Sequence, residues 1–158
     1  MKIKTYALLI FSHLTIAIVG FAIGIYSLPI LTAPKPPTNN ELKQLTDDRV
    51  FTTEFKRELE GSDFLHWGEG QVSLGKEFIT FDGKLSPGPD FKLYLSPEFI
   101  ETEEEFNRLK SSMRVIGDVN TFNNFIVKVP KDVELTNFNT VVVWCESFGE
   151  FITSSKYR

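Results

Sequence analysis

The stretch Thr140-Val-Val-Val-Trp-Cys-Glu-Ser-Phe148 decides how the rest of the chain folds. Three consecutive β-branched valines favour an extended strand, because their restricted χ1 angles suit a pleated sheet better than a helix. Side chains alternate along a strand, so this stretch has two different faces. The first face holds Val141, Val143 and Cys145. The second face holds Val142, Trp144, Glu146 and Phe148. Apolar residues on both faces predict a central strand that is covered on each side.

The predicted central strand carries the only cysteine of the sequence, Cys145. A single cysteine excludes an internal disulfide, a zinc knuckle, a C-x-x-C redox pair and covalent c-type haem attachment. Free cysteine is often a small, buried apolar residue, so Cys145 is either core packing or a functional thiol. Any redox chemistry or soft-metal ligation by cysteine in this protein has to involve Cys145.

Composition indicates one folded domain with accessory segments. The chain has 158 residues, of which 42% are hydrophobic and 24% charged, and these values are typical of a globular protein. Its 15 phenylalanines suit a sheet-rich core. The net charge is −4, and the sequence has no basic run beyond Lys2 and Lys4, so it lacks the positive surface that a nucleic-acid-binding protein needs.

Residues 6–31 contain no charged side chain and predict a transmembrane anchor. About 20 apolar residues span a bilayer as a helix. Lys2 and Lys4 precede the segment, which predicts that residues 1–5 are cytoplasmic and that the chain after Leu31 lies in the periplasm or outside the cell. The alternative is a cleaved signal peptide, but the apolar run is about twice the usual length of such a signal. Ala33 is also followed by Pro34, which hinders cleavage.

The anchor contains the small-residue pattern Gly20-Phe-Ala-Ile-Gly24. A G-x-x-x-G pattern lets two membrane helices approach closely, which predicts a weak homodimer through Gly20 and Gly24. Glycine is also simply common in membrane helices, so the pattern has a second explanation that needs no partner.

Residues 32–61 are interpreted as a linker followed by a juxtamembrane helical segment. Pro34-Lys-Pro-Pro37 is a short, stiff spacer, and Asn39 is a suitable N-cap for a helix through Leu45. In residues 51–60, apolar side chains recur at helical spacing and the pattern stops at Gly61, which predicts a second amphipathic helix. These apolar side chains are Phe51, Phe55 and Leu59.

Residues 62–158 consist of short alternating runs separated by turn residues. Gly75 marks a turn, and Asp82-Gly83 is a hairpin-type signal. Thr102 with Glu105 predicts a capped helix that reaches about Lys110. Seven or so short strands predict an all-β fold, an antiparallel β-sandwich with short peripheral helices.

Three motifs resemble the electron-transfer DM13 domain, a family often found beside DOMON domains. They are Gly88-Pro-Asp-Phe-Lys-Leu-Tyr-Leu-Ser96, Gly117-Asp118 and Val141-Val-Val-Trp-Cys-Glu-Ser-Phe148. The resemblance covers roughly Phe64 to the C-terminus. It implies an extracytoplasmic β-sandwich in which the cysteine is a redox thiol or a ligand to a prosthetic group such as haem. The sequence has no accompanying DOMON or cytochrome domain, so the redox partner is expected to be a separate protein.

The candidate site comprises Cys145, with His66 and Trp144 as supporting cofactor-binding residues. His66 is the only histidine outside the apolar segment and can serve as a second haem ligand, a proton relay or a packed structural residue. Motifs for a nucleophile elbow, a P-loop, a dinucleotide site or a zinc protease are all missing, which predicts an electron-transfer module rather than a catalyst with its own substrate. The competing interpretation is a non-redox module that binds a partner protein or glycan.

Overall fold

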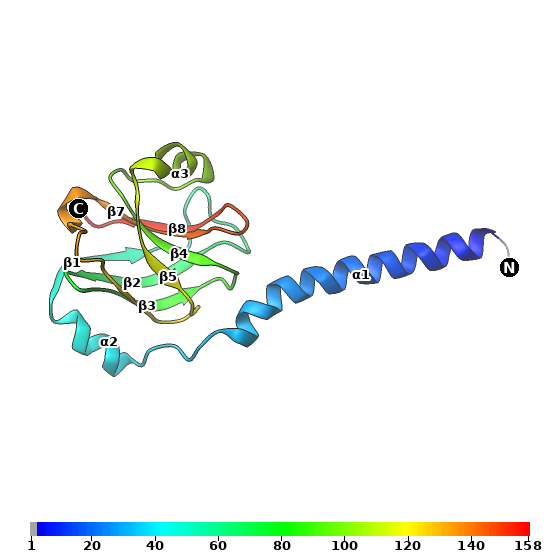
Figure 1. Ribbon diagram of the computed structural model, residues 1–158, viewed down its shortest axis with the longest axis horizontal. Coiled ribbons are helices and arrows are strands. Elements are labelled where there is room, and N and C mark those ends of the chain that lie inside the picture. The colour runs from blue at the N-terminus through cyan, green and yellow to red at the C-terminus, as the bar shows by residue number, and fades with distance from the viewer. Residues whose placement is uncertain (1–2) are drawn as a thin grey trace.

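Two four-stranded antiparallel sheets pack against each other and form the body of the protein (Figure 1). The computed structural model describes residues 3–158. The first sheet has the order β1 (Arg49–Phe55), β2 (Gly68–Gly75), β3 (Phe78–Leu85) and β6 (Phe125–Lys128). The second has the order β5 (Arg114–Val119), β4 (Phe91–Ser96), β7 (Thr140–Cys145) and β8 (Glu150–Lys156). The predicted antiparallel β-sandwich is confirmed.

Strand β7 is central in its sheet, as its two apolar faces predict. It pairs with β4 on one side and with β8 on the other, and all six of its residues are buried. Val141, Val143 and Cys145 belong to the core between the two sheets. Val142 and Trp144 belong to a second cluster on the outer face, together with Phe106 of helix α3.

Within residues 3–158, five helical segments accompany the sheets. They are α1 (Ile3–Thr32), α2 (Asn39–Thr46), α3 (Glu103–Leu109) and the 3-10 helices η1 (Lys110–Ser112) and η2 (Leu135–Asn137). Helix α1 is the one helix among residues 3–158 that is long and apolar enough to cross a membrane, and it projects away from the sandwich (Figure 1). The N-cap of α2 is Thr38 rather than the expected Asn39, and it forms a capping box with Glu41. Thr102 caps α3 as predicted.

Two expectations about secondary-structure type are wrong. The helix expected over residues 51–60 is largely strand β1, which pairs with β2 from Phe51 opposite Leu74 to Phe55 opposite Gly70. Residues four apart share a face in a strand as well as in a helix, so the spacing of Phe51 and Phe55 suits both.

The hairpin expected at Asp82-Gly83 is also absent, because both residues lie inside β3. Gly83 lies opposite Gly70, and a Cβ at Gly83 would be 2.2 Å from the Glu69 carbonyl oxygen. The glycine is therefore required by a close approach of two strands rather than by a turn.

The linker between α1 and α2 is held on the sandwich by Asn124. The Asn124 amide nitrogen donates to the Pro37 carbonyl at 3.2 Å and to the Asn39 side-chain oxygen at 3.0 Å. Its amide oxygen accepts a hydrogen bond from the Gly83 N–H at 3.2 Å. These contacts fix where the chain passes from the linker to the sheet.

Candidate functional site

A cavity of about 350 Å³ lies next to Cys145, where several loops meet the side of α1. The loop before β4 contributes Pro87, Gly88 and Pro89, and the turn after β7 contributes Phe148. Helix α1 contributes Tyr26. Most of the lining is apolar, with Tyr26, His66, Cys145 and Glu150 as its ionisable side chains. We call this cavity the Cys145 pocket.

Cys145 is the last residue of β7 and is only 3% exposed. Its Sγ donates a hydrogen bond to the Pro89 carbonyl at 3.1 Å. Burial raises the pKa of the Cys145 thiol, and the negative charges of Asp90 and Glu150 act in the same direction, while backbone N–H groups of Phe148 and Ser147 oppose them. The thiol is therefore protonated at neutral pH and is not an activated nucleophile.

His66 lines the Cys145 pocket and lies in a loop that is stabilised by hydrogen bonds to Asp63. One Asp63 oxygen accepts hydrogen bonds from the backbone N–H groups of Leu65 at 2.6 Å and His66 at 2.7 Å, and the other lies 3.1 Å from His66 Nδ1. Desolvation raises the pKa of Asp63, but these hydrogen bonds outweigh it and the pKa is lowered. A carboxylate on Nδ1 fixes the ring and directs Nε2 to other partners, as in many metal-binding histidines.

The loop before β4 and the turn after β7 are fastened to each other through Asp90. Asp90 has a positive φ of 54°, a conformation that aspartate tolerates better than most residues. Its carboxylate accepts a hydrogen bond from the Ser147 hydroxyl at 3.0 Å, and its backbone carbonyl accepts one from the Glu146 N–H at 3.0 Å. These bonds join the loop that carries Pro89 to the turn that carries Phe148, and both residues line the Cys145 pocket.

Trp144 lies on the other face of β7 and packs in the outer cluster. It is 1% exposed, and its ring stacks on Phe106 with a centroid distance of 3.7 Å and an interplanar angle of 6°. Within residues 3–158 its indole N–H has no hydrogen-bond partner. The structure thus brings Cys145 and His66 to one pocket and places Trp144 apart from them.

Phe148 is on the same side as Cys145, not on the opposite side as strand alternation predicts. Strand β7 ends at Cys145, and the following four-residue turn reverses the expected direction of the side chain. Tyr26 and Glu150 are the polar pocket residues that sequence reasoning missed. No local pattern in the sequence marks Tyr26 as a pocket residue, because the approach of the apolar segment to the sandwich is a tertiary property.

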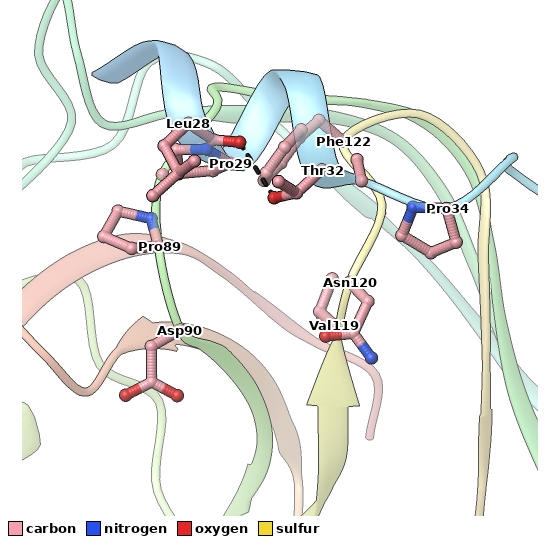
Figure 2. A pocket seen from close by; sticks show the side chains of 11 residues that line it. Leu28, Pro29, Thr32, Pro34, Pro89, Asp90, Val119, Asn120 and Phe122 are labelled. Atoms are coloured by element: carbon pink, nitrogen blue, oxygen red, sulfur yellow. Dashed lines mark hydrogen bonds between the residues drawn. The ribbon is translucent and has the colours of Figure 1, made fainter. Parts of the chain in front are cut away.

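The loop before β4 also borders a second cavity, of about 480 Å³, under the end of α1 (Figure 2). Leu28, Pro29 and Thr32 of α1 line it from one side. Pro89 and Phe122 line it from the sandwich. The last turns of α1 therefore lie beside the loop that carries the carbonyl partner of Cys145.

The acidic residues near α3 act as helix caps and surface groups. Glu105 accepts a hydrogen bond from the Glu101 N–H at 2.8 Å, and Glu103 accepts one from the Phe151 N–H at 3.3 Å. Within residues 3–158, no three histidine, cysteine, aspartate or glutamate side chains form a group that can hold a metal ion.

Comparison with known families identifies the domain that carries this pocket. The model of the family described as Electron transfer DM13 matches residues 38–157, more than half of the chain. The chain belongs to the electron-transfer DM13 family. The resemblance is confirmed, and the matched residues of the DM13 domain also include α2 and β1. Neither a curated protein nor a solved structure matches the chain.

Proposed function

We propose that this DM13 domain transfers electrons outside the cytoplasm through a prosthetic group bound by Cys145 and His66. The observation that supports the proposal is that the only thiol of the chain and the only imidazole of the sandwich line one largely apolar pocket. The electron donor or acceptor would be a separate protein.

The number of ligands favours haem over a bare metal ion. A bare ion such as zinc or copper takes about three or four protein ligands, and the described residues contain no such group. Haem would bring most of its ligands itself, so Cys145 and His66 would be sufficient to hold it, and both side chains are known haem ligands. The cavity of about 350 Å³ next to Cys145 is also within the range of cofactor pockets, about 300–1,000 Å³. Haem iron bound by these side chains would supply reversible one-electron chemistry.

The charges around the thiol suit a ligand role better than a bare-thiol role. Asp90 and Glu150 help to raise the pKa of Cys145, so a free thiolate is disfavoured. The same two negative charges stabilise a positively charged centre beside the sulfur. If Cys145 bound such a centre as the thiolate, it would give up its proton to solvent, so affinity would rise with pH.

The second candidate is a non-redox module in which Cys145 is core packing and the loops bind a partner protein or glycan. The specific observation in its favour is that Cys145 belongs to the inner core cluster and that its Sγ is bonded to the Pro89 carbonyl. Buried cysteine with a backbone acceptor needs no cofactor to be stable.

Spectroscopy on the full chain in detergent separates the two candidates. We expect added haem to give an absorption band that is lost in Cys145→Ser and weakened or shifted in His66→Ala. His13→Ala is the matched control, because it removes the only other histidine, which lies in α1. A parallel titration with copper tests a smaller centre. A chain that stays colourless, and whose thiol reacts with alkylating reagents only after unfolding, would favour packing.

We propose that α1 is a retained single-pass anchor in the inner (cytoplasmic) membrane, with residues 1–5 in the cytoplasm and the DM13 domain in the periplasm or outside the cell. The helix has 30 residues, none of which is buried, and Lys2 and Lys4 flank its start. The intact mass of the membrane-extracted protein tests retention, because cleavage near Ala33 would remove the apolar segment. Protease added to intact cells or spheroplasts should degrade the DM13 domain if this orientation is correct.

Pairing of two anchors through Gly20 and Gly24 remains a prediction. A Cβ placed at either glycine would meet nothing within 4 Å among the described residues, so this part of α1 is open to a second helix. Crosslinking of the full chain in membranes, compared with Gly20→Leu, would detect such a dimer.

A further inference from the structure

We propose that the Cys145 pocket lies at the outer surface of the bilayer, with an apolar rim seated in the lipid headgroup layer beside α1. The apolar rim consists of Phe64, Leu65 and Phe148. The inference rests on α1 being a retained anchor, as proposed above, and it names the lipid bilayer as the occupant of this surface.

The apolar rim is unusually exposed for a water-facing surface. Phe64 is 90% exposed and Phe148 is 54% exposed, while Leu65 is also exposed and lines the Cys145 pocket together with Phe148. Exposed apolar groups that gather in one place indicate an interaction surface. The three hydrogen bonds to Asp63 shape the loop that presents Phe64 to the outside.

Two tyrosines of α1 indicate the depth of the pocket. Tyr6 and Tyr26 are twenty residues apart, and a helical rise of about 1.5 Å per residue separates them by about 30 Å. This distance equals the thickness of the hydrocarbon core, about 30 Å, and tyrosine is enriched at both of its boundaries. Tyr26 lines the Cys145 pocket, and so does Ala22, one turn deeper in α1. The pocket therefore lies at the level of the outer boundary.

The sandwich lies beside the end of α1 (Figure 2). Leu28, Pro29 and Thr32 line the second cavity together with Pro89 of the sandwich (Figure 2). The linker that follows is bonded to Asn124. Because residues of α1 line both cavities together with loops of the sandwich, the apolar rim lies near the lipid surface when α1 spans the bilayer.

Charged groups limit how deeply the rim enters. Asp63, Asp90 and Glu150 lie around the Cys145 pocket, and charged groups are costly in the hydrocarbon core. We therefore place the rim in the headgroup layer and the uppermost acyl chains. The route from outside to Cys145 then passes through this layer, so a redox partner has to act at the membrane surface.

Fluorescence quenching by lipid tests this position. The full chain is reconstituted in phosphatidylcholine vesicles brominated near the headgroup, with Phe64→Trp, Phe148→Trp or Phe99→Trp. Phe99 is the matched control, because it is exposed and follows the end of β4 that lies away from the Cys145 pocket. The unsubstituted chain gives the background from Trp67 and Trp144. We expect the added rim tryptophans to lose about half of their fluorescence or more, since interfacial groups sit about 5–10 Å into the boundary, and the Phe99 variant to lose little.

The outcomes separate this inference from the proposals on which it rests. Equal quenching at all three positions in a chain that floats with the vesicles would overturn the rim position alone. A chain found without its apolar segment, and therefore not floating, would overturn both the anchor and the rim. The quenching comparison does not depend on haem, so a missing absorption band would leave its result unchanged.

Discussion

The two faces of β7 carry neighbouring residues in opposite environments. On the outer face, Trp144 is stacked on Phe106 and covered by α3. On the inner face, Cys145 belongs to the core between the sheets and also borders a cavity of about 350 Å³. The difference shows that one strand can supply both a fully packed side chain and a side chain with open space beside it. Trp144 lies inside β7, whereas Cys145 is the last residue of the strand.

The two faces of β7 are covered by different types of structure. Helix α3 covers the outer face and is capped by Thr102, so its position is set by packing and by backbone hydrogen bonds. Loops and the side of α1 cover the end of the inner face, and the Asp90–Ser147 hydrogen bond joins two of these loops. A loop held by a few polar bonds adjusts to a ligand at lower cost than a packed helix does.

The largest expected effect is on the outer face. Trp144→Ala removes the largest fully buried side chain and leaves Phe106 without its stacking partner. We expect the free energy of unfolding to fall by about 3–5 kcal/mol. Urea unfolding of the full chain in detergent measures it, and a loss below about 1 kcal/mol would contradict the packing described for this face.

Cys145→Ala should have a clearly smaller effect. The sulfur is buried, but it borders a cavity, so fewer packing contacts are lost than at Trp144. We expect a loss of about 1 kcal/mol, typical of a single substitution. If this variant were as unstable as Trp144→Ala in the same urea experiment, Cys145 would be essential core packing and the contrast between the two faces would fail.

The sequence predicts the faces of β7 well because alternation is a property of any strand. It identified the central strand, the separate faces of Val143 and Trp144, and the α3 cap at Thr102. It failed for Phe51 and Phe55, since a spacing of four is compatible with helix and strand and only pairing with β2 decides between them.

The pocket is less predictable because distant segments form it. His66 and Cys145 are 79 positions apart, and only the fold shows that they line the same cavity. Phe148 was assigned to the wrong side, because alternation stops where the strand stops. Tyr26 belongs to the apolar segment, and contact between that segment and the sandwich is a tertiary property with no local pattern.

The stability contributions of the adjacent residues Cys145 and Glu146 should depend on pH in opposite directions. The contribution of Glu146 should be lost on acidification. Desolvation raises its pKa, but hydrogen bonds from Tyr94 and Lys110 outweigh it and lower the pKa below 4.5. Its contribution to stability is therefore present above pH 4.5 and lost as pH falls through the lower folded pKa. We expect Glu146→Gln to be less stable at neutral pH and to lose less stability on acidification. Glu104→Gln, at an exposed residue of α3, is the matched control and should follow the unsubstituted chain.

The stability contribution of Cys145 should be lost as the pH rises. Burial raises its pKa above 9.0, so its contribution is complete below pH 9.0 and is lost as pH rises through the higher folded pKa. Tyr157, whose pKa is raised to about 12, acts in the same direction at higher pH. We expect the full chain to lose more stability than Cys145→Ser between about pH 8 and pH 11. Identical losses in both chains would mean that the thiol is not desolvated.

The smallest effect on stability is expected at Phe148, and it tests whether the end of the inner face is really open. Phe148 is 54% exposed and lies in the turn after β7, so Phe148→Ala should change the free energy of unfolding by less than about 0.5 kcal/mol. The same change removes one side of the Cys145 pocket, so alkylation of the native thiol should become faster although the fold is equally stable. Trp144→Phe is a useful comparison, because it alters the other face and should leave the alkylation rate unchanged. Faster alkylation only in the Phe148 variant would show that access to Cys145 is controlled by its own pocket, whereas a stability loss of several kcal/mol would mean that Phe148 belongs to the core.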